Sequence, residues 1–364
     1  MKKTRIFDGH NDTLTKLNSL DLDKGQTFFM NNADGQLDLP KARKGGMIGG
    51  LFGIFVPPPK TAEHKKENPY SGVQMSKAGS DDRPKNALDH TYASTYTNAV
   101  IDFAYKLENQ SNGEVQIVQS YQELEDAIES GALAMVLHFE GAAAISEDLS
   151  DLQGYYDKGL RSLGLVWSRS NAFCHGVPFM YPHSPDTGPG LTDAGKKLVA
   201  ACNNLGIVLD LAHLNEKGFF DVAKLSNHPL VVSHIGAHAL CPSTRNLTDE
   251  QIDAVGASGG TIGVVFAPFI VDYKVSEDGT PDNNMPISWI VRHIDYIAGR
   301  IGVDHVSLGS DFDGARMPTE LPDASHLPKL IDALKSGGFS EDSIEKIASK
   351  NWLRVIRQTW TGHV

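Results

Sequence analysis

Short runs of apolar residues, each ended by polar or turn-forming residues, recur along the whole chain. Two of them, GIVLDLAH (206–213) and GTIGVVFAP (260–268), are apolar almost throughout, which is typical of parallel strands covered on both faces. Eight runs have the length and composition of strands: 5–12, 46–56, 133–141, 161–168, 206–213, 230–234, 260–268 and 305–314.

Helical spacing of apolar residues appears between most of these runs, at 91–110, 191–206, 248–259 and 285–302. Strands that alternate with helices predict an α/β fold, and eight strands favour a (β/α)8 TIM barrel over an open doubly wound sheet. An open sheet should also carry a Gly-rich phosphate loop after the first strand, where DGHNDT has only one glycine.

Two stretches depart from this alternation. Residues 57–86 are polar and rich in Pro, Lys and Ser, which predicts a long inserted loop that could fold over the mouth of a barrel. The tail from Ser325 is expected to form additional C-terminal helices, separated by Gly337 and Gly338, that pack on the barrel as its closing layer. No repeat or linker divides the chain, so residues 1–364 are predicted to be a single domain.

Composition narrows the class of protein. With 33 Lys and Arg against 45 Asp and Glu, the net charge of -12 disfavours nucleic acid as a partner. Cys174, Cys202 and Cys241 share no C-x-x-C spacing, and we expect free thiols in a reducing compartment. Charged residues interrupt any apolar run near the N-terminus, so the sequence predicts no signal peptide, no membrane anchor and a cytoplasmic location.

Polar residues with ligand chemistry stand at the ends of the predicted strands. In a TIM barrel the C-terminal ends of the strands meet at one mouth, which carries the active site. Histidines and carboxylates from several strands would therefore converge there. The residues in question are His10, Asp12, Glu140, His213, His234, Asp311 and Asp313.

The first of these groups is the pair His10-x-Asp12. Side chains alternate along a strand with a period of two, so both can reach one cation while Asn11 points away. Imidazole nitrogen and carboxylate oxygen suit Zn²⁺. Taken alone, however, the pair fits a hydrogen-bonded turn better than a metal site.

Glu140 follows an apolar run that should be buried, and a buried carboxylate needs a cation or a proton. If Glu140 stood alone, an Arg or Lys partner would serve as well as a metal. His138 fits a core histidine better than a ligand.

His213 and His234 end consecutive predicted strands and should lie side by side. One binuclear metal site explains all these positions, whereas the alternative needs several independent coincidences.

The same residues lie in motifs that resemble those of the membrane (renal) dipeptidases and their bacterial relatives, in the metal-dependent amidohydrolase superfamily. The resemblance covers nearly the whole chain apart from residues 57–86. The motifs are DGHND, HFEG, GLTDAGKKLVAACNNLGIVLDLAHLNE, PLVVSHIGAHALCPSTRNLTDEQI, VSLGSDFDG and NWLRV.

The resemblance implies a set of metal ligands. His10 and Asp12 match the first-strand ligands of one zinc ion. His213 and His234 match the ligands of the second zinc ion. Glu140 matches the carboxylate that bridges both metals.

The resemblance also implies the chemistry. A water that bridges two zinc ions would lose a proton near neutral pH and attack the peptide carbonyl, while Asp311 would take the proton and pass it to the departing amine. Arg245 matches the arginine that holds the terminal carboxylate of the substrate in a bidentate grip. An alternative for Arg245 is a salt bridge to Asp249 or Glu250.

One position departs from the family's pattern. Where the fourth strand of the best-known animal members ends in a histidine near the substrate carbonyl, this chain has Trp167. His175 or Arg169 could take over that substrate-binding role, and Trp167 could form a pocket wall. We interpret Asp313 as a turn carboxylate and His238 as a residue behind the ligands or on the surface.

The sequence thus predicts a dipeptidase that depends on two zinc ions and hydrolyses dipeptides with a free C-terminal carboxylate. Tolerance of C-terminal D-residues is common in the family and is expected here, and a homodimer is plausible by resemblance only. Two alternatives stay open: another binuclear amidohydrolase, acting on lactones, cyclic amides or β-lactams, and a non-catalytic metal-bound barrel that binds a peptide. A deaminase is disfavoured, because Asp12 stands where those enzymes carry H-x-H.

Overall fold

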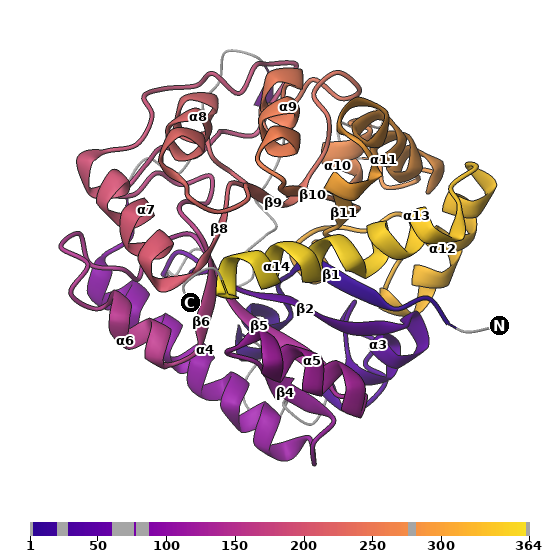
Figure 1. The fold of residues 1–364 in the computed structure, drawn as a ribbon, viewed down its shortest axis with the longest axis horizontal. Coiled ribbons are helices and arrows are strands. Elements are labelled where there is room, and N and C mark those ends of the chain that lie inside the picture. The colour runs from indigo at the N-terminus through magenta and orange to yellow at the C-terminus, as the bar shows by residue number, and fades with distance from the viewer. Residues whose placement is uncertain (1–2, 20–27, 60–75, 78–86, 276–281, 362–364) are drawn as a thin grey trace.

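The computed structural model describes residues 3–19, 28–59, 76–77, 87–275 and 282–361. Parallel strands form a barrel with helices on its outside, and neighbours around the barrel follow one another along the chain (Figure 1). This confirms the predicted (β/α)8 TIM barrel. The barrel strands are β1 (Ile6–Asn11), β2 (Met47–Ile54), β5 (Leu133–Glu140), β6 (Leu160–Gly164), β8 (Val208–Asp210), β9 (Val231–Ile235), β10 (Thr261–Val264) and β11 (Val306–Leu308).

The barrel is closed by contacts between the segments at the ends of β1 and β11. The Asp12 N–H donates to Phe312 O at 2.8 Å, and the Asp311 N–H donates to His10 O at 2.9 Å. These bonds exclude the open-sheet alternative. They also bring residues near position 10 against residues near position 311, although some 300 residues separate them in the sequence.

Helices cover the outside of the barrel. They are α1 (Thr13–Ser19), α3 (Leu39–Gly45), α4 (His90–Gln110), α5 (Tyr121–Ser130), α6 (Leu152–Asp157), α7 (Asp193–Leu205), α8 (Glu216–Leu225), α9 (Asp249–Ala257), α10 (Pro268–Val271), α11 (Ser288–Ile301), α12 (Leu327–Ser336), α13 (Glu341–Glu345) and α14 (Asn351–Thr361). Short 3-10 turns occur at Val303–His305 and Ala324–His326, and a π-helical turn joins α13 to α14 at Lys346–Lys350.

The four predicted helices correspond to α4, α7, α9 and α11. In α7 the Thr192 side chain accepts a hydrogen bond from the Gly195 N–H, and Gly206 ends the helix with a φ of 67°. Helices α1, α3, α5, α6, α8 and α10 were not predicted. In α5 only Leu124 and Ala127 are buried, and its ten residues are short for a helix to be found from the sequence.

Three short strands lie outside the barrel order. Strand β4 (Val115–Ile117) pairs with the beginning of β5, and β3 (Ser76–Lys77) pairs with β7 (Met180–Tyr181). Strand β3 falls within the predicted loop 57–86, most of which lies outside the described residues.

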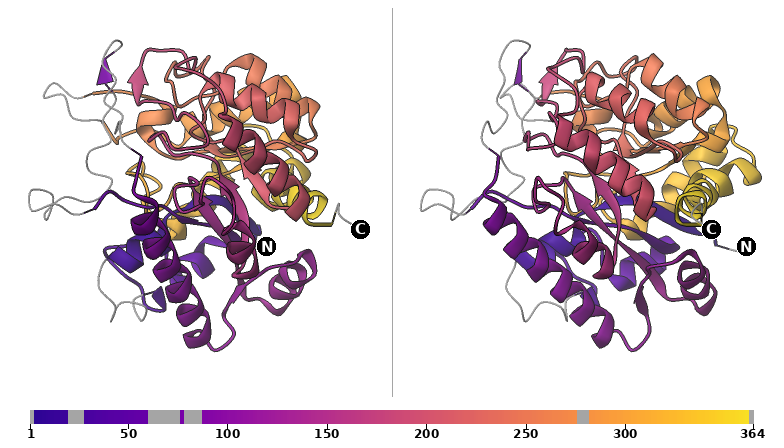
Figure 2. Two further views of the ribbon diagram at one scale, coloured as in Figure 1. Left: turned by 90° about the vertical axis from the view of Figure 1, so that its left-hand side faces the viewer. Right: turned by 60° about the vertical axis from the view of Figure 1, so that its left-hand side comes forward.

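The last helix closes the N-terminal end of the barrel, as the sequence predicts for its tail. Trp352 in α14 is buried, its Nε1–H donates to Leu308 O at 2.9 Å, and its ring lies against Phe7 at the start of β1. Figure 1 shows α14 crossing over the strands, and Figure 2 shows it on the opposite side of the molecule from β3 and β7. The other end of the barrel is therefore the one available for a site.

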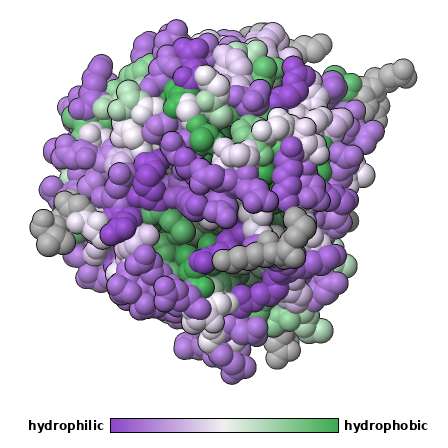
Figure 3. Space-filling view, turned by 45° about the vertical axis from the view of Figure 1, so that its right-hand side comes forward, coloured by the Kyte–Doolittle hydropathy of each residue, from purple (hydrophilic) through white to green (hydrophobic). Residues whose placement is uncertain are grey.

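The cysteines, the helices and the surface of the structure can be compared with the predictions from composition. Cys174, Cys202 and Cys241 are free, as predicted, and all three are buried. Within the described ranges, no helix has the length and apolar character needed to span a membrane. Figure 3 shows a face on which hydrophilic residues predominate and apolar residues gather in hollows.

Candidate metal centre

The sequence places every candidate residue within a predicted strand, but Asp12, His213, Asp311 and Asp313 lie just past the ends of their strands. Strand β8 ends at Asp210 and β11 at Leu308, whereas His213 and Asp311 follow with φ angles of 65° and 62°. L-residues rarely adopt this left-handed conformation, which ends the strand, and residues held in it are frequent at functional sites. The barrel thus uses locally strained backbone to present both side chains at its C-terminal mouth.

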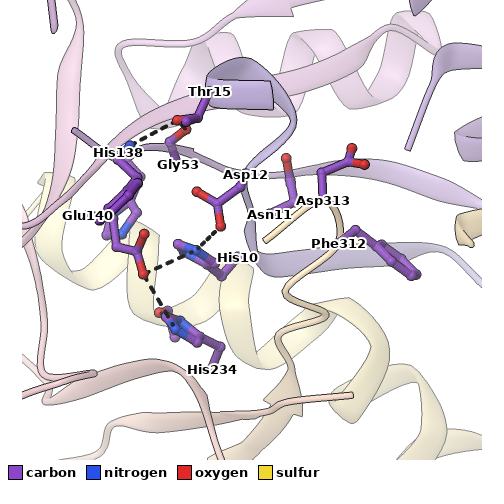
Figure 4. Close-up of polar contacts among 12 residues, drawn as sticks. His10, Asn11, Asp12, Thr15, Gly53, His138, Glu140, His234, Phe312 and Asp313 are labelled. Carbon is purple, nitrogen blue, oxygen red and sulfur yellow. Dashed lines mark hydrogen bonds and ion pairs between the residues drawn. The ribbon is translucent and has the colours of Figure 1, made fainter. Parts of the chain in front are cut away.

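Glu140, the last residue of β5, lies at the centre of three histidines. Its Oε1 atom is 3.1 Å from His213 Nε2 and 3.8 Å from the Nε2 atoms of both His10 and His234. Figure 4 shows the side chains of His10, His234 and Glu140 pointing toward one another. No described Lys or Arg forms an ion pair with Glu140, although the charge of Arg245 is near enough to lower the pKa of Glu140.

A second group of donors shares His10 with the first. His10 Nε2 lies 3.4 Å from Asp12 Oδ2, which confirms that the two residues face the same space, while Asn11 turns away (Figure 4). The ligand atoms of His10, Asp12 and Asp311 lie within 4.8 Å of one another, as do those of His10, Glu140 and His234. The described residues thus form two overlapping donor groups.

Gly314 allows the two carboxylates of the second group to approach the chain. A Cβ atom at this position would lie 2.0 Å from Asp12 Oδ2 and 2.4 Å from Asp311 Oδ1, which real Cβ atoms do not show. Gly53 on β2 is similarly close, because its Cβ would lie 3.1 Å from His10 Cε1 and 3.2 Å from Asp12 Oδ1. The glycines leave room that the donor atoms need.

The donor atoms fit a divalent metal ion. Among the described residues, His10 Nε2, Asp12 Oδ1 and Glu140 Oε2 are buried and have no hydrogen-bond partner. Buried polar atoms of this kind are normally paired, so their number in one place fits the ligands of a cation. Histidine nitrogens with carboxylate oxygens form a ligand set that holds Zn²⁺ and several other divalent ions.

The pKa values of Glu140 and His10 also fit a site that binds a cation. Burial raises the pKa of Glu140 well above its usual value, and the neighbouring Asp12 adds to the effect. Burial alone would lower the pKa of His10, but Asp12 and Glu140 outweigh it and raise that pKa to about 10. These shifts show that the buried carboxylates favour a positive charge beside them, as metal ligands do.

The rings of His213 and His234 are oriented from behind by hydroxyl groups that sequence reasoning missed. His213 Nδ1 lies 3.0 Å from Ser168 Oγ, and His234 Nδ1 lies 2.8 Å from Ser233 Oγ. Ser233 in turn donates to Asp210 Oδ2 at 2.5 Å, so it accepts from His234 and leaves Nε2 free. The signal for Asp210 was a carboxylate inside the apolar run GIVLDLAH.

Arg245 lies beside this cluster and is only 1% exposed. Its Nη2 atom is 3.3 Å from His213 Nε2 and donates to His234 O at 3.4 Å, while Nε and Nη1 have no partner among the described residues. Within the described structure, Arg245 forms no ion pair with Asp249 or Glu250, so that alternative is wrong, and Asp249 pairs with Arg300 at 3.0 Å. Two of the Arg245 donors are thus available to a bound ligand.

Trp167 and Arg169 line a pocket next to Glu140. The Trp167 ring contacts Phe55, with centroids 4.9 Å apart, and its centroid is 5.7 Å from that of His213. His175 lies on the same loop, where its Nδ1 atom is 3.4 Å from Ser170 Oγ, and it does not line this pocket.

Asp313 and His238 lie away from the donor cluster. Asp313 accepts hydrogen bonds from Thr13 Oγ1, Lys16 Nζ and the Gln36 N–H, and Figure 4 shows its side chain pointing away from His10. His238 Nε2 is 3.0 Å from His183 O. Both placements match the predicted roles outside the ligand set.

A closed parallel barrel with histidines and carboxylates at its C-terminal mouth defines the class of metal-dependent amidohydrolases. The sequence model for "Membrane dipeptidase (Peptidase family M19)" matches residues 1–362. The chain belongs to this family, and it is a metallopeptidase.

Individual relatives agree with this assignment. A metallopeptidase from Rhodobacter sphaeroides, solved with a phosphinate mimic of L-Ala-D-Ala, is 39% identical, has a TM-score of 0.90, and the match covers 99% of this chain and 100% of that one. Dipeptidase tcpJ of Claviceps purpurea (strain 20.1) is 27% identical over 98% of this chain and 77% of its own length. An uncharacterized protein in the pqqA 5' region of Klebsiella pneumoniae is 44% identical over 69% of this chain and 91% of its own length.

Proposed function

We propose that this metallopeptidase is a dipeptidase that uses two zinc ions to hydrolyse dipeptides with a free C-terminal carboxylate, including those with a C-terminal D-residue. The observation that carries the proposal is the position of Glu140 Oε1, within 3.8 Å of the Nε2 atoms of three histidines from other strands. A carboxylate so placed is suited to bridging two metal ions.

The ligands divide into two sets around Glu140. His10 and Asp12 would hold one zinc ion, and His213 and His234 would hold the other. Zinc would lower the pKa of a bound water toward neutrality and polarise the carbonyl of the peptide bond.

Asp311 is the group that would move the proton. It is buried beside His10 and Asp12, and burial raises its pKa to about 7 although His10 opposes the shift. A carboxylate at this position, within reach of the space between His10 and Asp12, would take a proton from the attacking water and give it to the departing amine. No covalent intermediate with the protein is needed.

Arg245 would bind the terminal carboxylate of the substrate. Its free Nε and Nη1 donors lie beside the histidine cluster, and a planar guanidinium binds carboxylates in a bidentate manner. This explains a requirement for a carboxylate close to the cleaved bond, hence dipeptides. Trp167 would form the wall of the substrate pocket, and His175 remains a candidate for contact with substrate.

Support for the substrate class comes from the Rhodobacter sphaeroides relative, whose ligand mimics a dipeptide with a C-terminal D-residue. The proposal names dipeptides as the only partners of this protein. It involves neither nucleic acid nor a membrane. A homodimer and a cytoplasmic location stay predictions from the sequence.

The test is a panel of L,L and L,D dipeptides assayed with zinc present, beside the same dipeptides with an amidated C-terminus, a lactone and a β-lactam. The proposal expects the free dipeptides to have the highest kcat/KM and amidation to abolish turnover. Preference for the lactone or β-lactam would establish the other amidohydrolase function. Asp311→Asn should keep the metal and lose turnover, and equal turnover would contradict the proton role.

A further inference from the structure

A second arginine near the mouth of the barrel has no anionic partner among the described residues. Arg169 is only 8% exposed, and the hydrogen bond it makes within the described ranges is a long one from Nη1 to Val56 O, at 3.5 Å. Its guanidinium carbon is 5.7 Å from the centre of the Trp167 ring. Across the described parts of the chain, no Asp or Glu forms an ion pair with it.

Arg161, another buried arginine of this barrel, donates its hydrogen bonds to carbonyl oxygens of the protein. It donates to Gln119 O at 2.6 Å, to Tyr156 O at 2.7 Å and to Leu160 O at 2.9 Å, and it packs on the Tyr156 ring. Among the described residues, none of the Arg169 nitrogen atoms is both fully enclosed and without a partner, so its remaining donors are accessible to a ligand. Arg169 therefore has binding capacity that the described residues do not use.

The guanidinium of Arg169 and the candidate ligand Glu140 line one pocket. Trp167 and Phe55 line it as well, together with the polar residues Ser170 and Asn171. A ligand bound at Glu140 therefore has Arg169 on the wall of the same pocket. Arg245, which would bind the terminal carboxylate, lies elsewhere, against His213 and the backbone of β9. The two arginines can therefore bind two different anionic groups.

We propose that Arg169 determines specificity by binding a second carboxylate of the substrate, so that preferred dipeptides contain an aspartate or glutamate residue. The proposal rests on the proposed dipeptidase function and names its substrate class. The guanidinium forms a bidentate contact with the acidic side chain, while Trp167 and Phe55 cover the apolar part of that side chain. An uncharged isostere such as asparagine leaves the buried charge unpaired and binds less well.

The experiment compares kcat/KM for dipeptides that differ only in charge, with zinc present. Asp-Ala is compared with Asn-Ala, and Ala-Asp with Ala-Asn, so that the pairs reveal which residue of the substrate carries the carboxylate. The proposal expects an advantage for the acidic member of one pair on the order of 10- to 100-fold, the usual effect of a charge-assisted hydrogen bond. No advantage in either pair overturns it.

Variants assign the preference to Arg169. Arg169→Gln should bring the acidic and amide substrates to similar kcat/KM values, and Arg169→Lys should retain part of the preference. Arg292→Gln is the matched control, because it removes an exposed arginine that lies over Trp289 on α11, away from the pocket. An acidic preference that survives Arg169→Gln overturns the assignment. A uniform loss on all substrates also overturns it, because that result indicates a contact with the scissile carbonyl.

Failure of this inference is distinguishable from failure of the proposed function. Hydrolysis of Ala-Ala establishes the dipeptidase activity whatever the effect of an acidic side chain. If Ala-Ala and all four charged or amide substrates are inert with zinc present, the proposed function fails and the specificity proposal fails with it. Thermal melting of each variant shows whether it has folded.

Discussion

The Nε2 atoms of His213 and His234 lie 3.1 Å apart at the mouth of the barrel. Burial lowers the pKa of both rings well below the usual value, with Arg245 and His10 adding to it, so each ring is expected to be neutral. Because the Nδ1 atoms face serine hydroxyls, Nε2 lone pairs are directed into the shared space next to Glu140. This arrangement is suited to a cation.

Ser233→Ala tests how the ring of His234 is held. The change removes the hydroxyl that joins His234 Nδ1 to Asp210, so the ring loses its fixed orientation. We expect metal affinity to fall by about 10- to 100-fold, the usual effect of losing such a supporting group. Zinc titration monitored by competition with a chelator measures the change.

Ser307→Ala is the matched control for this prediction. Ser307 is another buried barrel serine, but it bonds to Thr261 Oγ1 at 2.8 Å and to no histidine in the described structure. It should lower stability slightly and leave zinc affinity unchanged. Equal affinity losses in the two serine variants would show that the effect is a general disturbance of the barrel.

Gly314→Ala tests the space between the carboxylates. The added methyl group would collide with Asp12 Oδ2 and Asp311 Oδ1 and push them from their positions. We expect overpacking to cost about 1 to 3 kcal/mol and to lower both bound metal and kcat/KM by at least roughly tenfold. Gly299→Ala in α11 has no atom within 4 Å of the new Cβ and should be neutral or stabilising. Full metal content in Gly314→Ala would refute the proposed role of this glycine.

The candidate ligands could be selected from the sequence because each of them ends an apolar run. Glu140 is the last residue of β5 and His234 lies on β9, so their positions at the strand ends follow from the sequence pattern alone. Ser168 and Ser233 could not be predicted as ring supports, because a serine near a strand end carries no signal of what lies behind it in space. Their roles depend on the angle of each histidine ring, which only tertiary packing determines.

His293, a buried residue that is not a candidate metal ligand, makes the stability of the fold depend on pH. It accepts a hydrogen bond from the Ala237 N–H at 2.9 Å, and its Nε2 donates to Val271 O at 2.9 Å, so it must be neutral. Burial lowers its pKa to about 4. Since the unfolded state, with a pKa near 6.5, binds the proton more tightly, this group destabilises the fold as pH falls from about 6.5 to 4, by about 3 kcal/mol in total.

His293→Gln removes that titration. We expect the variant to be less stable than the wild type at pH 7 and the difference between them to shrink toward pH 4. Urea unfolding in the presence of a chelator measures both proteins without contributions from bound metal. A difference that stays constant between pH 7 and 4 would show that His293 does not titrate in this range.

The pairing of Arg245 was also beyond sequence reasoning. Its position four residues before Asp249 allowed a local salt bridge, and only the fold shows that Asp249 is taken by Arg300 from α11. The contact of Arg245 with His213 joins segments 32 residues apart. The eight strands, by contrast, were predictable because burial on both faces leaves continuous apolar runs in the sequence.

The central claim is tested most directly by turnover of an L,D-dipeptide as zinc is added back to chelator-treated protein. The account predicts no activity in the metal-free protein and full activity at two zinc ions per chain, since Glu140 would join two ligand sets. Glu140→Gln should bind less zinc and show no turnover at any zinc concentration. Full activity in the metal-free protein, or unchanged turnover in Glu140→Gln, would contradict the account.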